Sequence, residues 1–114
     1  MATLGVPSLT DRLGAHPTGA LVYELASALR VHLLRRDLIR LGRGRRADIS
    51  LADVTVSRCH ALVLTRPDGA IEVIDESSLS GTRVNGVAVQ RRRLDHGDVI
   101  RFGRTDVRYV QLGP

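Results

Sequence analysis

Closely spaced turn residues divide most of the chain into short apolar segments. From Ala20 onward, runs rich in valine, isoleucine and leucine alternate with glycine, proline, asparagine and aspartate. This alternation of apolar runs and turn residues is typical of an all-β sandwich or barrel, because each short run suits one strand and each polar interval suits one turn. The predicted strands are Ala20–Leu25, Arg30–Leu34, Leu38–Leu41, Ile49–Leu51, Ala61–Thr65, Ala70–Ile74, Thr82–Val84, Val87–Val89, Val99–Phe102 and Val107–Leu112.

Two turns have sequences that predict how the strands around them pair. In the segment Arg66–Gly69, proline sets the first turn angle and glycine accepts a positive φ, so the flanking strands should form a hairpin. Asn85-Gly86 is the strongest short hairpin signal. The leucines and alanines of Leu21–Leu34 also fit a helix, and we regard strands as the better interpretation.

Length and composition set the scale of the fold. With 114 residues, 43% of them hydrophobic, the chain is long enough for one domain with a buried core and too short for two. Residues 1–19 lack periodicity and are expected to form a flexible N-terminal arm, which leaves residues 20–114 as the domain. No apolar run could span a bilayer, and Met1–Pro17 lacks the pattern of a secretory signal, so we expect a cytoplasmic protein without membrane contact.

The residue content disfavours several kinds of function. One cysteine, Cys59, and four scattered histidines give no metal-ligand spacing, and Cys59 is expected to be a small buried residue. The chain has no lysine, so Gly42–Gly44 cannot be a phosphate-binding P-loop. Ser57 and His60 lack a glycine elbow and an orienting acid, which leaves a hydrolase triad unsupported. We therefore expect no cofactor, no metal and no enzyme activity.

Arginine provides all of the positive charge. Seventeen basic residues, all of them arginine, against 12 acidic residues give a net charge of +5 and a pI near 10.9. The planar guanidinium suits carboxylates and phosphates, which makes acidic or phosphorylated partners the first to consider. The aromatic content of 3% argues against a surface that stacks nucleic-acid bases, so nucleic acid is an unlikely partner.

Three predicted loops combine the residue types that a phosphate needs. They are Leu41–Arg46, Val56–Ala61 and Ser77–Gly86. Guanidinium supplies charge and a bidentate fork, hydroxyl groups supply short donors, and glycine lets backbone N–H groups approach closely. Just before the third loop, Asp75 is expected to hold a turn with Ser77 or Ser78.

The order of these motifs resembles the forkhead-associated (FHA) domain family. The resemblance covers about Leu38 to Gly103 and rests on Gly42-Arg43, Ala47–Leu51, Val56–Ala61, Asp75–Ser78, Gly81–Gly86 and Leu94–Gly103. It implies a β-sandwich of two mainly antiparallel sheets that binds phosphothreonine peptides through loops at one end.

The resemblance also implies roles for individual residues. Arg43 and Ser57 match the principal phosphate contacts, and Arg58 matches a position that often adds a polar contact. The structural positions, which brace or shape the loops, are Gly42, His60 and Gly86. The remaining peptide-binding positions lie in the second binding loop and are Ser80, Gly81, Thr82 and Asn85. Among them, the resemblance implies that Asn85 holds the loop shape by side-chain hydrogen bonds.

Two residues depart from the family pattern. Ser80 stands where the family commonly has an asparagine that holds the ligand backbone, and Leu79 stands where a hydroxyl residue is frequent. Serine reaches less far than asparagine, so one side of the expected ligand clamp is thinner.

The leading hypothesis is therefore a non-catalytic module that recognises a phosphothreonine-containing protein, either a Ser/Thr protein kinase or its substrate. One alternative is a phosphorylation-independent scaffold on the same fold, docking through a sheet face or the Leu79-Ser80 surface. A weaker alternative is a basic nucleic-acid-binding domain. A variant of the leading hypothesis places a phosphorylated threonine of the arm, Thr3, Thr10 or Thr18, in the chain's own site.

Overall fold

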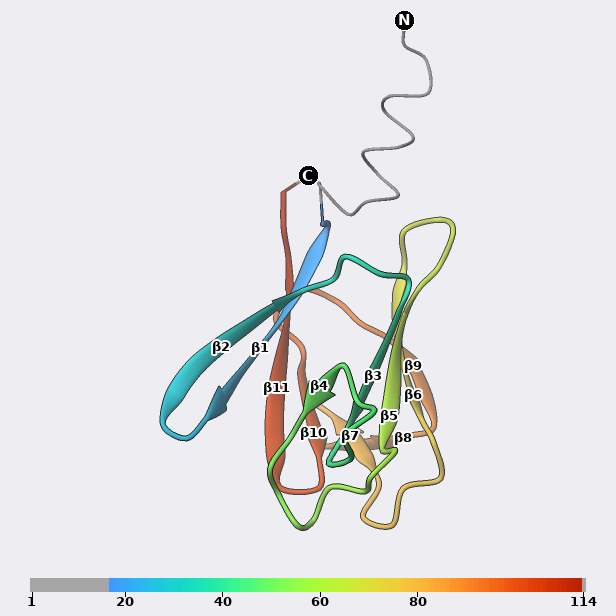
Figure 1. Ribbon diagram of the computed structural model, residues 1–114. Helices are drawn as coiled ribbons and strands as arrows, with labels where there is room; N and C mark the ends of the chain where they lie inside the picture. Colours follow the sequence, from blue (N-terminus) through green and yellow to red (C-terminus); the bar gives the residue numbers. More distant parts are fainter. Residues whose placement is uncertain (1–16, 114) are drawn as a thin grey trace, which may run out of the picture.

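A computed structural model describes residues 17–113, which fold into two β-sheets packed face to face (Figure 1). One sheet has six strands in the order β2-β1-β11-β10-β7-β8, and the other has five in the order β4-β3-β5-β6-β9. Neighbouring strands are antiparallel except β3 and β4, which are parallel. The predicted β-sandwich of two mainly antiparallel sheets is confirmed. The strands are β1 (Gly19–Leu25), β2 (Ala28–Leu33), β3 (Leu38–Gly42), β4 (Ile49–Ser50), β5 (Ala61–Thr65), β6 (Ile71–Asp75), β7 (Thr82–Val84), β8 (Val87–Val89), β9 (Arg91–Arg93), β10 (Val99–Phe102) and β11 (Thr105–Gln111).

The hydrophobic core lies between the sheets and is built by alternating side chains. Along β10, Ile100 and Phe102 are buried while Arg101 is exposed, because successive side chains point to opposite faces of a strand. Burying one large apolar side chain of this kind contributes about 1.5–3 kcal/mol. The core draws on both sheets, and its fully buried members include Leu21, Ile39, Leu41, Ile49, Val63, Val73, Val84, Ile100 and Phe102.

The predicted strands are present with small shifts at their ends. The Arg66–Gly69 turn joins β5 to β6 as expected, with the Gly69 N–H donating to the Arg66 carbonyl over 2.9 Å. The segment Leu21–Leu34 forms the β1–β2 hairpin, so its helical interpretation is wrong. Ala26 and Ser27 make the turn with φ of 52° and 64°. Positive φ is uncommon for alanine and serine, so their residue types do not predict this turn.

Two features of the fold were not predicted. Arg91–Arg93 forms β9 at the edge of the five-stranded sheet, where Arg91 donates to the Glu72 carboxylate over 2.7 Å. The folded part also begins slightly before residue 20, since β1 starts at Gly19 and the Thr18 carbonyl accepts a hydrogen bond from the Leu112 N–H. Residues 1–16 of the expected arm lie outside the described residues.

The strand directions bring three loops to one end of the sandwich. Because β5 is antiparallel to both β3 and β6, the start of β5 lies beside the ends of its two neighbours. The loops β3–β4, β4–β5 and β6–β7 consequently meet at the lower end in Figure 1. Among residues 17–113, no helix is long and apolar enough to cross a bilayer.

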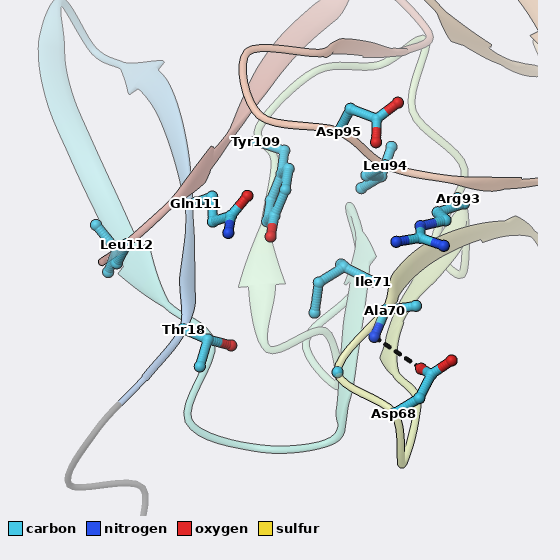
Figure 2. Close-up of a pocket in the computed structure, with 11 residues that line it drawn as sticks. Thr18, Asp68, Ala70, Ile71, Arg93, Leu94, Asp95, Tyr109, Gln111 and Leu112 are labelled. Carbon is cyan, nitrogen blue, oxygen red and sulfur yellow. Dashed lines mark hydrogen bonds between the residues drawn. The ribbon is translucent and has the colours of Figure 1, made fainter. Parts of the chain in front are cut away.

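The opposite end of the sandwich has a small hollow of its own (Figure 2). Its volume is about 300 Å³, and Thr18, Arg93 and Tyr109 are among the residues that line it. Burial raises the pKa of the Tyr109 hydroxyl, and the charge of Asp95 adds to this effect. Because Thr18 lines this hollow, it lies at the end of the sandwich opposite the three loops.

Candidate functional site

The loops that follow β3 and precede β5 are joined through their backbones. The Arg43 N–H donates to the Ser57 carbonyl over 2.9 Å, and the Gly44 N–H donates to the Arg58 carbonyl over 3.2 Å. This close approach depends on Gly42, because a Cβ atom built there would lie 2.0 Å from the Arg58 carbonyl oxygen. No side chain fits in that space without moving the loop, so position 42 requires glycine.

Arg43 and Ser57 lie side by side at the edge of the loop cluster. The Arg43 Nε–H donates to the carbonyl of Val56 over 3.0 Å, which fixes the guanidinium beside the neighbouring Ser57. Within residues 17–113 this is the only hydrogen bond of the Arg43 side chain. The Ser57 Oγ accepts the Leu79 N–H over 3.1 Å, so its own hydroxyl hydrogen remains to be donated. We call the Arg43 and Ser57 side chains together the anion rim.

His60 connects two of the loops from inside. Its side chain is fully buried, with the ring edge against the Phe102 ring at a centroid distance of 5.6 Å. The Nδ1 atom accepts the Ser57 N–H over 3.0 Å, and Nε2 lies 2.9 Å from the Gly81 carbonyl. These partners specify a neutral ring with hydrogen on Nε2, which donates to Gly81. His60 therefore holds the Ser57 loop and the Gly81 loop at a set separation.

Asp75 organises the β6–β7 loop. Its carboxylate accepts hydrogen bonds from the Ser78 hydroxyl at 2.5 Å, the Ser78 N–H at 3.1 Å and the Thr82 hydroxyl at 2.7 Å. The expected turn between Asp75 and Ser78 is thus present. Burial of the Asp75 carboxyl raises its pKa, but the hydrogen bonds from Ser78 and Thr82 outweigh burial, and the net pKa is lowered.

Thr82 differs from its expected place among the peptide contacts. It begins β7, is 1% exposed, and points its hydroxyl inward to Asp75. An inward hydroxyl with a buried partner is not available to a ligand. Thr82 therefore supports the loop, while the neighbouring Gly81, with φ of 83°, turns the chain into the strand.

Ser80 connects the β6–β7 loop to the β4–β5 loop. Its hydroxyl donates to the Thr55 carbonyl over 2.6 Å, so in this structure the side chain braces two loops. The residues beside this hydrogen bond are apolar and open to solvent: Leu79 is 99% exposed and Val54 is 90% exposed. The loop end thus presents apolar side chains close to the anion rim.

The sequence reasoning missed a hydrogen-bond network centred on Asp53. The Asp53 carboxylate accepts the Thr55 N–H and hydroxyl over 2.8 and 2.7 Å and the Thr105 hydroxyl over 2.7 Å. The Thr55 hydroxyl also accepts the Arg104 N–H over 2.9 Å. The side-chain hydrogen bond from Thr55 is the main reason that the pKa of Asp53 falls to about 2. The Asp-x-Thr spacing, typical of a local side-chain-to-backbone turn, was the available signal.

Asn85 and Gly86 lie away from the anion rim. They form the β7–β8 turn with φ of 50° and 85°, beyond the end of β7 that is distant from Gly81. At about 3.3 Å per residue, the strand carries Asn85 on the order of 10 Å from Gly81. The Asn85 side chain donates to Asp98 over 2.9 Å and accepts the Val99 N–H over 3.0 Å. Asn85 shapes this turn, and a direct contact with a peptide at the rim is not supported.

Arg58 and Cys59 both lie on the surface beside the anion rim. The expectation that Cys59 is buried is wrong, because Val56 and His60 take the inward positions of this loop and leave Cys59 exposed. Among the described residues, no three His, Cys, Asp or Glu side chains are grouped to hold a metal ion.

Comparison with known proteins places this arrangement in a family. The family model for the FHA domain matches residues 39–103, more than half of the chain. The oxoglutarate dehydrogenase inhibitor of Corynebacterium diphtheriae is 42% identical over 82 residues, which cover 72% of this chain and 56% of that protein. The chain thus spans about half of that relative. The FHA domain-containing protein FhaA of Mycobacterium tuberculosis is 39% identical over 68% of this chain, and the match covers 15% of FhaA.

Solved structures have the same fold. An FHA domain from a study of phosphothreonine-dependent FHA domain interactions superposes with a TM-score of 0.77 and 31% identity, covering 85% of this chain and 99% of that one. The FhaA FHA domain complexed with the intracellular domain of Rv3910 superposes with a TM-score of 0.74 and 33% identity, covering 81% and 99%. By the family-model match, the sequence identity and the structural superposition, this chain belongs to the FHA domain family.

Proposed function

We propose that this domain is a non-catalytic recognition module that binds phosphothreonine on a partner protein. The observation that carries the proposal is the anion rim, where the Arg43 guanidinium is held beside a Ser57 hydroxyl that still has a hydrogen to donate. A phosphothreonine has nearly two negative charges at neutral pH and three acceptor oxygens. Arg43 supplies the charge, Ser57 supplies a short donor, and Arg58 on the adjoining surface adds a second guanidinium.

The partner under this proposal is a protein phosphorylated by a Ser/Thr kinase, or the kinase itself. The family membership of the chain and the phosphothreonine-dependent interactions of the similar FHA domain support this choice. Phosphorylation then acts as a switch, because it creates the dianion that the rim binds. The variant in which Thr18 fills the chain's own site is disfavoured, since Thr18 lies at the opposite end. Thr3 and Thr10 lie outside the described residues.

Calorimetric titration of the full chain with a phosphothreonine peptide library and its unphosphorylated counterpart tests the proposal. We expect dissociation constants on the order of micromolar for the best phosphopeptides, about −8 kcal/mol. Arg43→Ala and Ser57→Ala should each weaken binding by about 10-fold or more, because a hydrogen bond to a charged group is worth about 1.5–3 kcal/mol. Arg36→Gln, an exposed arginine outside the loop cluster, is the matched control. No preference for the phosphorylated peptides would contradict the proposal.

A phosphorylation-independent scaffold is the second candidate, favoured by the nearly complete exposure of Leu79 and Val54. Exposed apolar side chains of this size often mark an interaction surface. In that case Leu79→Ser would weaken partner binding, whereas Arg43→Ala and Ser57→Ala would leave it unchanged. Binding that depends on Arg43 but tolerates Leu79→Ser would exclude the scaffold.

A further inference from the structure

A groove of about 420 Å³ lies next to the anion rim, on the outer face of the five-stranded sheet. Arg40 of β3 and Leu62 of β5 are directly paired there, and they face outward because Ile39 and Leu41 of β3 face the core. The lining combines small or apolar residues with four arginines. We call it the arginine groove, and its lining includes Arg40, Arg45, Arg46, Ala47, Arg58, Cys59, Leu62 and Glu76.

The four arginines of the groove make no ion pair with any other described residue, whereas Arg66, Arg91 and Arg101 elsewhere each pair with a carboxylate. The one acidic residue in the lining is Glu76. Four guanidinium groups around a single carboxylate leave a local excess of positive charge. Guanidinium pairs bidentately with carboxylates, and carboxylates are the anionic side chains of an ordinary peptide, so the charge complementarity points to aspartate and glutamate.

The groove is continuous with the anion rim. Arg58 follows Ser57 in the chain, and Gly44 follows Arg43, with the Gly44 N–H bonded to the Arg58 carbonyl. Both residues line the groove, so it begins one residue from each member of the rim. An extended peptide advances about 3.3 Å per residue, and a ligand whose phosphate occupies the rim therefore reaches the groove within a few residues.

We propose that the arginine groove is a subsite for an acidic flank of the same phosphopeptide, in which carboxylates contact the four arginines and an apolar side chain contacts Leu62. The proposal rests on the proposed function, and it adds the class of ligand: phosphothreonine next to aspartate or glutamate residues. Arg45 and Arg46 are the specificity-determining residues, since they line the groove and lie outside the rim.

The test compares two phosphothreonine peptides of equal length, with the full chain as the binding protein. One has aspartate and glutamate around a leucine on both sides of the phosphothreonine, and the other has asparagine and glutamine at the same positions. We expect the acidic peptide to bind about 5–10-fold more tightly, the effect of a few solvent-exposed ion pairs. Arg45→Gln with Arg46→Gln should reduce this preference below about 2-fold and leave binding of the neutral phosphopeptide unchanged.

The matched control removes two positive charges at the opposite end of the sandwich. Arg36→Gln with Arg93→Gln has the same change in net charge, and Arg93 lines the far hollow (Figure 2). The control should keep the full preference for the acidic peptide. Equal loss of preference in both double variants would attribute it to net charge and overturn the subsite. Absence of any preference in the unmodified chain would overturn it as well.

Cys59 provides a second measurement that does not depend on affinity. It is the only cysteine of the chain, it is exposed, and it lines the groove. With the protein saturated by either phosphopeptide, alkylation of Cys59 should be several-fold slower under the acidic peptide than under the neutral one. Equal alkylation rates under two bound phosphopeptides would refute the subsite while leaving phosphothreonine binding intact. If neither phosphopeptide binds, the proposed function fails first.

Discussion

The contact between Gly42 and the Ser57-Arg58 backbone gives a prediction whose size follows from one distance. A Cβ atom at position 42 would lie 2.0 Å from the Arg58 carbonyl oxygen, whereas ordinary contact begins at 3.4 Å. In Gly42→Ala, the Arg58 segment must therefore retreat by about 1.4 Å, the difference between these distances. That shift breaks the hydrogen bonds between the two loops and moves Ser57 away from Arg43.

The energetic cost can be added from its parts. Two lost backbone hydrogen bonds cost about 2 kcal/mol together, and overpacking adds about 1–3 kcal/mol. The loss of chain entropy in the unfolded state when glycine becomes alanine offsets about 0.4–1 kcal/mol. We expect the free energy of unfolding to fall by about 2–5 kcal/mol, a large part of the 5–15 kcal/mol typical of a domain. Phosphopeptide affinity should fall at least 10-fold, since the rim opens.

Gly44→Ala is the matched control for this prediction. A Cβ atom at position 44 would lie 3.2 Å from the same Arg58 oxygen, a contact that a shift of a few tenths of an ångström relieves. Urea denaturation of both variants, read by circular dichroism, gives the two free energies of unfolding. If Gly42→Ala is as stable as Gly44→Ala, the backbones of the two loops are not in contact and the geometry of the anion rim is wrong.

Three further predictions test the supports of the loops. Thr82→Val keeps the side-chain shape but removes the hydrogen bond to Asp75, so the free energy of unfolding measured in urea should fall by about 1–2 kcal/mol; an unchanged midpoint would refute this role. Asn85→Ala removes two side-chain hydrogen bonds, one of them to Asp98, and should destabilise the fold by about 1–3 kcal/mol. Its phosphopeptide affinity should stay within about twofold of the parent, as expected for the loss of one distant side chain, and a tenfold loss would place the side chain at the ligand. The pKa of Asp53 is about 2 in the fold against an ordinary 3.8, so its stabilisation is present above about pH 4 and is lost as the pH falls through 2. Asp53→Asn should thus flatten the decline of the melting temperature between about pH 4 and pH 2, to which Asp75 also contributes; parallel curves would contradict this.

Local turn chemistry explains why so many of the strands could be predicted. The Arg66–Gly69 and Asn85-Gly86 turns have residues that fit their backbone angles, and the strands on either side lie where the alternation of apolar residues places them. The Ala26-Ser27 turn and the β9 strand were harder to predict. The first has positive φ at residues without a turn signature, and Arg91–Arg93 is a strand only because the edge of β6 offers it hydrogen-bond partners and Glu72.

The candidate site divides in the same way. Arg43, Ser57 and His60 were chosen from the sequence because a resemblance in motif order covers them. Whether a side chain faces a ligand or the interior could not be read there. Threonine and cysteine each occur both buried and exposed, so the residue type alone does not decide the environment. In the structure Thr82 is buried and Cys59 is exposed.

The sequence by itself determined the alternation of strands and turns and the excess of arginine, since these are properties of local backbone preference and composition. Only the tertiary structure decided which loops meet, because that depends on strand directions and on contacts between residues distant in the chain. The Asp53 network, the hydrogen bond from Ser80 to Thr55 and the arginine groove all join separate segments. No local pattern encodes such contacts, since their energies exist only after the two sheets have packed.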